Sequence, residues 1–325
     1  MGARQQVAPP AQHVSRADCI VFLNRASARQ FGPTRGETAL MAAVRDAFAA
    51  AGLSVDPILV SGDALEAAVR RALDSGPDIV VAGGGDGTIS TVAERLAGTG
   101  TALGILPLGT LNHFAKDLGI PLDLADAVRT IVAGRQVQVD MGEVNGRLFL
   151  NNASLGIYPA LVSEREQHQA RGYRKWTALA IAAWTMWRRY RRVRVAIHTG
   201  SELRVIHTPF VFVGNNAYDF TTRRPGGRGR LDAGTLHLAV APGMSRKTMA
   251  RALALALTGR FSPDQHLDTW FAPRLAVSAW RRSVRLALDG ELVRLTTPLQ
   301  FRIRPRVLRV CVPSSVDATT RHRVG

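Results

Sequence analysis

Short apolar runs alternate with helical periodicities along the first part of the chain, up to about Gly134. Asp18–Asn24, Val55–Val60 and Ile79–Ala82 are brief and rich in β-branched residues, a pattern that predicts buried strands. Thr38–Ala51, between the first two runs, has the spacing of a helix. Strands that alternate with helices indicate an α/β domain built on a parallel sheet.

The apolar pattern shortens to a period of two from Val137 onward. Val137, Val139 and Met141 alternate with polar residues, and further strand-like runs follow. Several short strands in succession predict a mainly β second domain. The later runs are Val193–Thr199, Arg204–Val213, Leu236–Ala241, Arg274–Val277 and Val284–Leu288.

The charge balance changes this picture by indicating a polyanionic partner. Lys and Arg outnumber Asp and Glu by 42 to 25 in 325 residues, which gives a formal net charge of +17. Such a surplus favours nucleic acid or an anionic membrane surface. Neither zinc-finger spacing nor an RNP-like aromatic strand accompanies it, so we expect no nucleic acid and favour the membrane. No run of eighteen apolar residues is present, which predicts peripheral contact with lipid.

The cysteines and histidines give no metal or disulfide signal. Cys19 and Cys311 stand alone in apolar runs, which fits core positions in a protein of the reducing cytosol. The first seventeen residues lack the apolar core of a secretory signal. We therefore expect a cytoplasmic, peripherally membrane-associated protein. His207, His237 and His266 lack the spacing of metal ligands, so we expect ordinary surface or core histidines at these positions.

A glycine-rich turn follows the run Ile79–Ala82 and carries the first candidate chemistry. Its residues are Gly83, Gly84, Gly85, Asp86, Gly87 and Thr88, and helical spacing begins at once after them. Strand, glycine turn and helix point backbone N–H groups and a helix dipole at a phosphate. Glycines admit the phosphate oxygens, and so tight a turn predicts positive φ. Asp86 could coordinate Mg²⁺ on the phosphates or cap the helix.

A second turn of the same kind lies in the segment Gly104–Pro121. It runs from an apolar strand through Gly109, Thr110 and Asn112 into a helix. Successive turns of this kind meet at the carboxyl ends of parallel strands, where open α/β sheets bind ligands. We expect both turns to contact the nucleotide phosphates, although Asn112 could cap the helix instead.

These motifs carry a family resemblance. Gly83–Thr88 and Pro107–Pro121 resemble the catalytic domain of the diacylglycerol kinase and bacterial lipid kinase family, which is related to sphingosine kinases and, distantly, to NAD kinases. Further matches occur at Asn151–Gly156, Phe212–Asn216 and Leu288–Glu291. Together they span most of the chain in the family's order, from Asp18 to Pro313.

The resemblance implies an α/β plus β fold: an N-terminal α/β nucleotide-binding domain, a C-terminal β-sandwich-like domain, and an active site in the cleft between them. It also implies a terminal strand that returns to the first domain. We expect a flexible tail at 1–17, the α/β domain at 18–137, a β-rich lipid-substrate domain at 138–300, the returning strand at 301–313, and a tail at 314–325.

The resemblance also assigns roles to single residues. Phosphoryl transfer needs cradled phosphates, a bridging metal and a base. Asp86 is expected at the Mg²⁺–ATP complex. Glu291 would deprotonate the lipid hydroxyl, with Asp289 assisting it or the metal. Read without the resemblance, Asp289-Gly290 is a hairpin turn between apolar runs, and the two interpretations are compatible.

The chain departs from the family pattern in several places. Asn24 and Ser27 match a phosphate-contacting turn, but Arg25 and Ala28 replace its Pro and Gly; Arg25 could compensate by charge. Ile58 stands where the family carries a nucleotide-contacting Thr, and His113 replaces a common Asp.

A structural metal site of bacterial members is also altered. The segment Arg230–Thr235 matches it, but Ala233 occupies the position of the ligand Asp. Asp232 is adjacent and would need a shifted register, so we expect a weakened or absent site.

The stretch Tyr173–Arg192 provides the membrane signal. At 100° per residue, aromatic residues that include Trp176, Trp184 and Trp187 fall within an arc of about 120°. Arg188 and Arg189 lie mostly opposite them. This arrangement is typical of an interfacial helix on an anionic leaflet, but an amphipathic helix can equally face a core. Arg223–Arg230 is a second basic loop, either a headgroup contact or a flexible turn.

The leading hypothesis is an ATP- and Mg²⁺-dependent lipid kinase that phosphorylates a hydroxyl of diacylglycerol or a related lipid at the membrane surface. Two alternatives stay open: an NAD kinase, and a catalytically degenerate module that binds nucleotide or membrane. Intact Asp86, Asn112 and Glu291 favour the enzyme. The sequence leaves the acceptor lipid, its acyl chains and the oligomeric state open.

Overall fold

The computed structural model describes residues 18–32, 35–156, 192–200, 202–219, 227–243, 245, 248, 251 and 267–314. A parallel group of strands forms its first part, in the spatial order β2-β1-β3-β4. These strands are β1 (Cys19–Asn24), β2 (Ile58–Val60), β3 (Ile79–Gly84) and β4 (Ala102–Pro107). The helices between them are η1 (Arg25–Phe31), α1 (Gly36–Ala50), α2 (Gly62–Leu73), α3 (Asp86–Leu96), α4 (His113–Asp117) and α5 (Leu124–Ala133).

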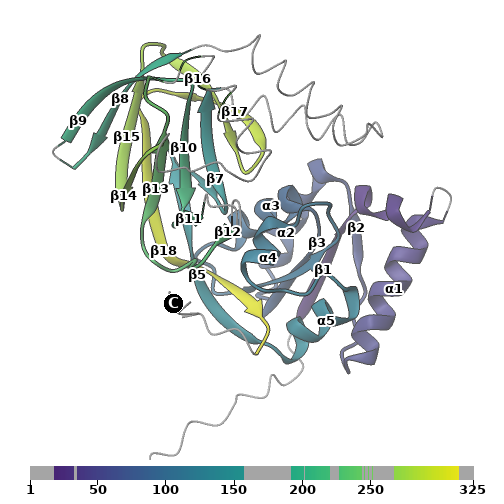
Figure 1. The fold of residues 1–325 in the computed structure, drawn as a ribbon. Coiled ribbons are helices and arrows are strands. Elements are labelled where there is room, and N and C mark those ends of the chain that lie inside the picture. The colour runs from purple at the N-terminus through teal and green to yellow at the C-terminus, as the bar shows by residue number, and fades with distance from the viewer. Residues whose placement is uncertain are drawn as a thin grey trace, which may run out of the picture.

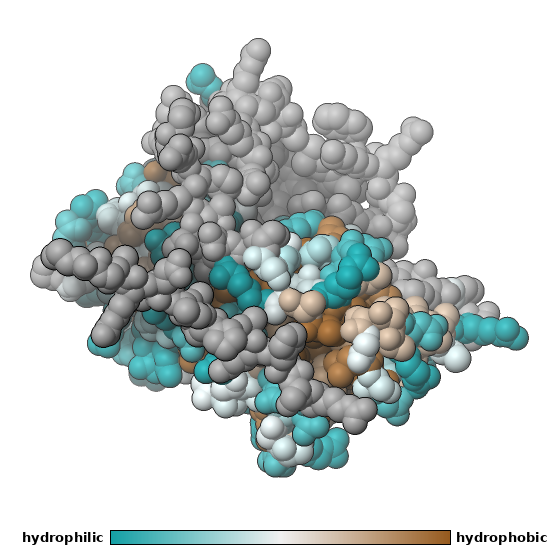
Figure 2. All heavy atoms as spheres, turned by 90° about the horizontal axis from the view of Figure 1, so that it is seen from below, coloured by the Kyte–Doolittle hydropathy of each residue, from teal (hydrophilic) through white to brown (hydrophobic). Residues whose placement is uncertain are grey.

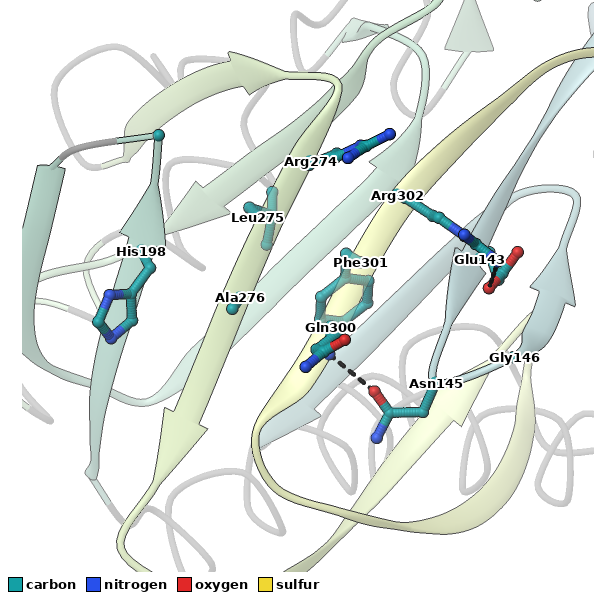
Figure 3. Close-up of a pocket in the computed structure, with 11 residues that line it drawn as sticks. Glu143, Asn145, Gly146, His198, Arg274, Leu275, Ala276, Gln300, Phe301 and Arg302 are labelled. Atoms are coloured by element: carbon teal, nitrogen blue, oxygen red, sulfur yellow. Dashed lines mark hydrogen bonds and ion pairs between the residues drawn. The ribbon is translucent and has the colours of Figure 1, made fainter.

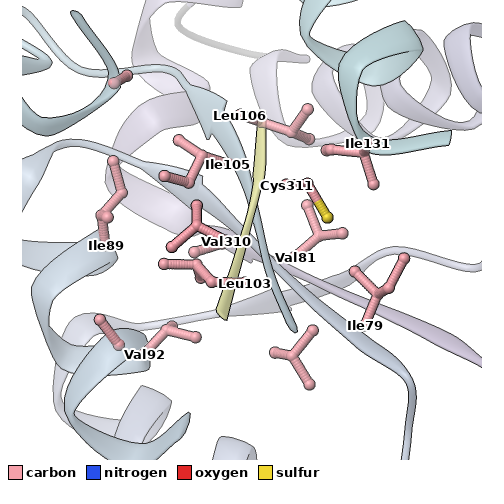
Figure 4. Close-up of a cluster of buried hydrophobic side chains, with 14 of the residues drawn as sticks. Ile79, Val81, Ile89, Val92, Leu103, Ile105, Leu106, Ile131, Val310 and Cys311 are labelled. Atoms are coloured by element: carbon pink, nitrogen blue, oxygen red, sulfur yellow. The ribbon is translucent and has the colours of Figure 1, made fainter. Parts of the chain in front are cut away.

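Helices cover both faces of these parallel strands, as the sequence pattern predicts. Helix α1 packs with α5, and α2 packs with α3. The strands between them are buried along their whole length in β3 and β4, which explains their continuous apolar runs. Figure 4 shows Ile89 and Val92 of α3 on one side of the strands and Ile131 of α5 on the other.

The second part of the chain is a pair of facing sheets. The parallel strands belong to a larger sheet, which continues from β4 through β18, β15 and β8 to β9. In this sheet β5 also pairs with β18, and β6 pairs with β5. A second sheet has the order β14-β13-β10-β7-β16-β17. Apolar side chains from both sheets fill one core, among them Val195, Leu238 and Phe301. This confirms the predicted α/β plus β-sandwich-like fold (Figure 1).

The strands of this second part have the following bounds. Those of the larger sheet are β5 (Arg135–Val144), β6 (Arg147–Phe149), β8 (Val193–Thr199), β9 (Glu202–Thr208), β15 (Arg274–Ala279) and β18 (Leu299–Val312). Those of the second sheet are β7 (Asn152–Gly156), β10 (Phe210–Asn215), β13 (Leu236–Val240), β14 (Asp268–Ala272), β16 (Ser283–Leu288) and β17 (Glu291–Thr296). Strands β11 (Tyr218–Asp219) and β12 (Gly227–Arg228) form a separate ribbon.

Strands β5 and β18 run through both parts of the molecule. They pair antiparallel from Phe301↔Val144 to Val312↔Arg135, and the end of β18 pairs parallel with β4 at Arg309↔Ala102. The register shifts between Arg304 and Leu308. Leu308 and the residues after it pack in the α/β core, whereas Leu299, Phe301 and Ile303 pack in the β core. One strand pair therefore links the two cores.

Buried Asp140 holds the irregular part of this strand pair. Arg306 has a φ of 50°, and its backbone N–H donates to Asp140 Oδ1 at 2.9 Å. The N–H of Gly234 donates to Oδ2 of the same carboxylate at 2.7 Å. A buried carboxylate needs such donors, so Asp140 ties the bulge of β18 to the turn before β13.

The described surface is mixed in polarity, and no described helix is long and apolar enough to cross a membrane. Seen from below, hydrophobic residues gather in a patch bordered by hydrophilic ones (Figure 2). Trp176, Trp184, Trp187, Arg188 and Arg189, the predicted membrane contacts, lie outside the described residues.

Burial of His237 predicts acid sensitivity. Burial lowers the pKa of His237 to about 4, its Nδ1 accepts the Tyr218 N–H at 3.0 Å, and its ring stacks on Phe271. In the unfolded chain this histidine has an ordinary pKa near 6.5. Between pH 6.5 and pH 4 the unfolded state therefore binds more protons than the folded state, and stability falls as pH falls. We expect a loss of roughly 2–3 kcal/mol from this residue between pH 7 and pH 4.5.

Denaturant unfolding at pH 7 and pH 4.5 measures this effect. Wild type should lose more stability on acidification than His237→Gln, whose amide oxygen can still accept the Tyr218 N–H. Exposed His198→Gln is the matched control and should follow wild type. Equal acid sensitivity of wild type and His237→Gln would contradict the prediction.

Candidate functional site

Three turns meet at one edge of the parallel strands. Strands β1, β3 and β4 are neighbours in the sheet, so the turns after them lie side by side. Asn24, at the end of β1, donates from Nδ2 to Thr88 Oγ1 at 2.8 Å and accepts from the Ala26 N–H at 2.9 Å. The N–H of Leu108 donates to the carbonyl of Gly84 at 3.1 Å. These bonds join the turns into one surface.

The glycines of this surface are required by close packing. A Cβ on Gly109 would lie 2.4 Å from the Cα of Gly85, and one on Gly84 would lie 2.5 Å from Thr88 Oγ1. None of Gly83, Gly84, Gly85, Gly87 and Gly109 has a positive φ. The expectation of left-handed backbone in the first turn is therefore wrong. The backbones of the two turns are so close that no side chain fits between them. The N–H groups at the start of α3 are therefore not covered by side chains at the glycine positions.

Asp86 lies between the two turns. It is half-buried in the first turn of α3, whose N-cap is Gly85, and its Oδ1 accepts the Phe114 N–H at 3.4 Å. The carboxylate thus reaches across to the start of α4. Mg²⁺ in phosphotransfer sites uses one or two carboxylates together with the substrate phosphates. One carboxylate beside a helix N-terminus fits that requirement.

Asn112 shapes the second turn through its side chain. It is buried, has a φ of 50°, and accepts the Gly109 N–H on Oδ1 at 3.0 Å. Its Nδ2 donates to the carbonyls of Pro107 and Gly109 at 3.1 and 2.8 Å. It makes no side-chain cap for α4. Asn112 holds the turn that carries Thr110, which is exposed; its own contact with nucleotide stays a prediction.

The predicted hairpin at Asp289-Gly290 is present and reaches this surface from the β part. Strands β16 and β17 pair antiparallel up to Leu288↔Glu291, and the two turn residues have φ values of 49° and 93°. Positive φ at both central positions is the geometry of a tight two-residue hairpin, for which Asp-Gly is preferred. Glu291 is exposed, and its Oε1 lies 3.6 Å from the position of a Cβ on Gly87. The hairpin tip therefore lies against the first turn of α3.

Asp289 has a different environment from Glu291. Its Oδ1 accepts the N–H groups of Asn151 and Asn152 at 2.7 and 3.1 Å. Its Oδ2 accepts the Leu150 N–H at 2.7 Å and the hydroxyl of Ser90. Burial raises the pKa of Asp289, and these four hydrogen bonds oppose that rise. Both oxygens are engaged, so the carboxylate holds the hairpin to α3 and to the turn before β7.

Buried Arg228 donates hydrogen bonds to the same turn before β7. Its guanidinium donates to Asp117 Oδ2 at 2.7 Å, to the Leu150 carbonyl at 2.7 Å and to Asn151 Oδ1 at 2.7 Å. It also donates to the Asn215 carbonyl at 3.3 Å. We call Arg228 and these four partners the Arg228 clamp. Arg228 is thus neither a headgroup contact nor part of a flexible turn; residues 223–226 of that loop lie outside the described residues.

The remaining predicted site residues make fewer contacts with the two glycine turns. Ser27 is half-buried in η1, beside the turn after β1. Arg25 pairs with Glu37 at 3.2 Å, so its charge is partly used on the protein's own surface. Asp232 accepts a hydrogen bond from Arg230 at 3.1 Å, a pairing that competes with a cation. Within the described ranges, no group of three or more metal-ligating side chains is found. The metal contact of Asp232 stays a prediction.

A larger groove lies elsewhere, on the outer face of β5, β18, β15 and β8. It has a volume of about 740 Å³ and is lined by Arg274, Arg302, Glu143 and His198, among others. Figure 3 shows Arg302 directed at Glu143, whose carboxylate also accepts from Arg304 at 2.9 Å. The buried acid of this groove is neutralised by two arginines. The smaller cleft between Gly87, Ser90, Asp289 and Glu291 contains the exposed carboxylate of Glu291 and is the candidate active site.

Comparison with known proteins identifies the family of this chain. Residues 18–144 match the model of the diacylglycerol kinase catalytic domain, and residues 154–312 match that of the YegS C-terminal NAD kinase beta sandwich-like domain. A Bacillus subtilis (strain 168) protein named diacylglycerol kinase is 30% identical over 271 residues, 80% of this chain and 88% of that protein. The chain belongs to the diacylglycerol kinase and YegS-like lipid kinase family.

Two further similarities differ in extent. A Klebsiella pneumoniae (strain 342) protein named "Probable lipid kinase YegS-like" is 45% identical over 106 residues, and the match spans 32% of this chain and 35% of that protein. The crystal structure of a diacylglycerol kinase from Bacillus anthracis strain Sterne has a TM-score of 0.66 at 19% identity, and the match covers 93% of this chain and all of that one. The structural likeness supports the fold.

Sequence reasoning missed Ser90 and the Arg228 clamp. Ser90 is four residues after Asp86 and so lies on the same face of α3, a spacing that could have identified it. Arg228 gave no such signal, because it lies in a glycine-rich basic run that is typical of a solvated loop. Its partners Asp117, Asn151 and Asn215 occur in the family motifs, but the motifs do not show that one guanidinium joins them.

The clamp should contribute strongly to stability. Arg228→Met would leave the Asp117 carboxylate, which is 10% exposed, without its charge partner, and would remove the Arg228 donor from Asn151 Oδ1. Removing one member of a buried ion pair costs about 3–5 kcal/mol. Denaturant unfolding should show that loss, and the double variant Arg228→Met/Asp117→Asn should recover part of it.

Arg230→Met is the matched control. Arg230 is two residues away and pairs with Asp232, but its side chain is 53% exposed. Pairs of that kind contribute roughly 0–1 kcal/mol. Equal losses in Arg228→Met and Arg230→Met would show that the clamp does not hold the two parts together.

Proposed function

We propose that this protein is an ATP- and Mg²⁺-dependent lipid kinase that acts at the surface of an anionic membrane. It would transfer the γ-phosphate to a hydroxyl of diacylglycerol or a related lipid. The observation that carries the proposal is the position of Glu291. A carboxylate from the β part lies against the first turn of α3, where the glycine turns leave backbone N–H groups open to phosphate.

The residues divide the reaction between the two parts of the chain. Backbone N–H groups of Gly85–Thr88 and the turn of Gly109 and Thr110 would bind the phosphates, with Asn24 and Ser27 beside them. Asp86 would hold Mg²⁺, which neutralises charge on the transferring phosphoryl group. Glu291 would accept the proton of the lipid hydroxyl while the oxygen of that hydroxyl forms a bond to the γ-phosphorus. The bond from that phosphorus to the β–γ bridging oxygen breaks, and ADP leaves.

The contrast between the two acids supports Glu291 as the base. A general base needs a free lone pair within reach of the substrate proton. Asp289 has both oxygens engaged by hydrogen bonds, whereas Glu291 is exposed at the mouth of the cleft. Asp289 would therefore act as a positioning residue that fixes the hairpin.

The test is phosphate transfer from ATP to diacylglycerol, sphingosine, phosphatidylglycerol, ceramide and NAD. Glu291→Gln removes the proton acceptor and Asp86→Asn removes the metal ligand, each with little change in volume. Loss of a general base lowers rates by about 10²–10⁴-fold, so Glu291→Gln should lose transfer to the lipid that wild type uses. Asp86→Asn should lose it as well, because the metal that it would hold neutralises the charge of the transferring phosphoryl group. Glu94→Gln, a nearby acid that lines the same cleft, is the matched control and should keep activity.

Each other outcome is informative. Transfer to NAD alone would identify an NAD kinase. ATP binding without transfer to any acceptor would favour the degenerate binding module. Transfer that survives Glu291→Gln would refute the assignment of the base.

A further inference from the structure

The turn after β15 presents a tryptophan to solvent. Trp280 is 82% exposed, the highest value among the large exposed hydrophobic side chains of the described residues. The turn is held by Thr297, which donates from its hydroxyl to the Arg281 carbonyl at 2.7 Å and from its N–H to the Arg282 carbonyl at 3.0 Å. A hydrogen-bonded turn therefore keeps a large apolar side chain in water.

The strand register places a cation beside this side chain. Ala279 of β15 pairs with Val195 of β8, so Trp280 and Arg194 are close on adjacent strands. The Arg194 guanidinium carbon lies 4.5 Å from the centroid of the Trp280 ring. This contact orients the ring and leaves most of its surface exposed.

Two further apolar side chains project from the same sheet face. Leu203 and Val205 of the edge strand β9 are 58% and 52% exposed. Their neighbour Ile206 packs into the β core, so alternation along the strand directs Leu203 and Val205 outward. Ala279 likewise packs inward, which directs Trp280 outward. We call Trp280, Arg281, Arg282, Arg194, Leu203 and Val205 the Trp280 surface.

The charge next to Trp280 is positive. Arg192, Arg194, Arg281 and Arg282 flank it, and the stretches 192–199 and 279–285 contain no Asp or Glu. The exposed acid Glu202, which precedes Leu203, pairs with Arg204 at 3.0 Å. A second copy of the chain would bring the same positive charge to this face, which disfavours self-association. The partner must combine negative charge with an apolar interior.

We propose that the Trp280 surface docks the protein onto an anionic lipid bilayer. Tryptophan prefers the membrane interface, where its ring meets the acyl boundary and its N–H meets water. Arginines next to an anionic surface each add favourable electrostatic energy. The inference rests on the proposed lipid kinase function, because the substrate of such an enzyme is held in a bilayer that the enzyme must reach.

Vesicle co-sedimentation of the full chain tests this surface. Wild type should bind vesicles of phosphatidylcholine with about 30 mol% phosphatidylglycerol and release with added salt. Trp280→Ser should weaken binding about tenfold or more, given the burial energy of a large aromatic side chain. Arg281→Gln and Arg282→Gln should each weaken it by about fivefold.

Leu122→Ser is the matched control, because Leu122 is 51% exposed but lies in the α/β part, before α5. It should bind vesicles as wild type does. Unchanged binding in Trp280→Ser, or equal loss in Leu122→Ser, would overturn the proposal. Loss of binding to a single-stranded oligonucleotide or of self-association in Trp280→Ser, with vesicle binding intact, would assign the surface to a different partner and would also overturn it.

The kinase assay separates this proposal from the proposed function. With substrate dispersed in detergent micelles, Trp280→Ser should transfer phosphate at the wild-type rate, whereas with substrate in anionic vesicles its rate should fall in step with its binding. A wild type that binds vesicles through Trp280 but transfers no phosphate in either format would refute the kinase and leave the docking surface standing.

Discussion

The arrangement of the candidate site depends on the buried carboxylate of Asp289. Desolvating a carboxylate is costly, and the backbone N–H groups of residues 150–152 and the hydroxyl of Ser90 offset part of that cost. Those donors come from the turn before β7 and from α3. The ion can therefore be satisfied only when the hairpin, this turn and the helix are in place together. Its position two residues before Glu291 transfers that constraint to the proposed base.

The buried guanidinium of Arg228 also holds the turn before β7 in place. Arg228 binds the carbonyl of Leu150 and the side chain of Asn151, so the same turn is held between a buried cation and a buried anion. Asp117 extends the clamp to α4, which follows the second glycine turn. Strands β5 and β18 add a continuous ladder between the two cores. The two glycine turns and the hairpin that carries the proposed base are thus aligned by hydrogen bonds that cross from one part to the other.

The sequence predicted what local patterns determine. A strand, a glycine turn and a helix were readable at Gly83–Thr88 because each has its own period and composition, and Asp-Gly predicted the hairpin before Glu291. What depends on packing between distant segments was not readable. The glycines serve close approach of two turns, and buried Arg228 has the sequence context of a solvated loop. The exposure of Trp280 follows from strand register, which the motifs do not encode.

The central claim is that the α/β part binds nucleotide and the β part supplies the base. Calorimetric titration of ATP with Mg²⁺ into wild type, Glu291→Gln and Asp86→Asn tests it most directly. The account predicts that Glu291→Gln keeps the wild-type nucleotide affinity while its transfer rate is lost, and that Asp86→Asn binds nucleotide more weakly. Equal weakening of nucleotide binding in both variants would contradict the division of roles.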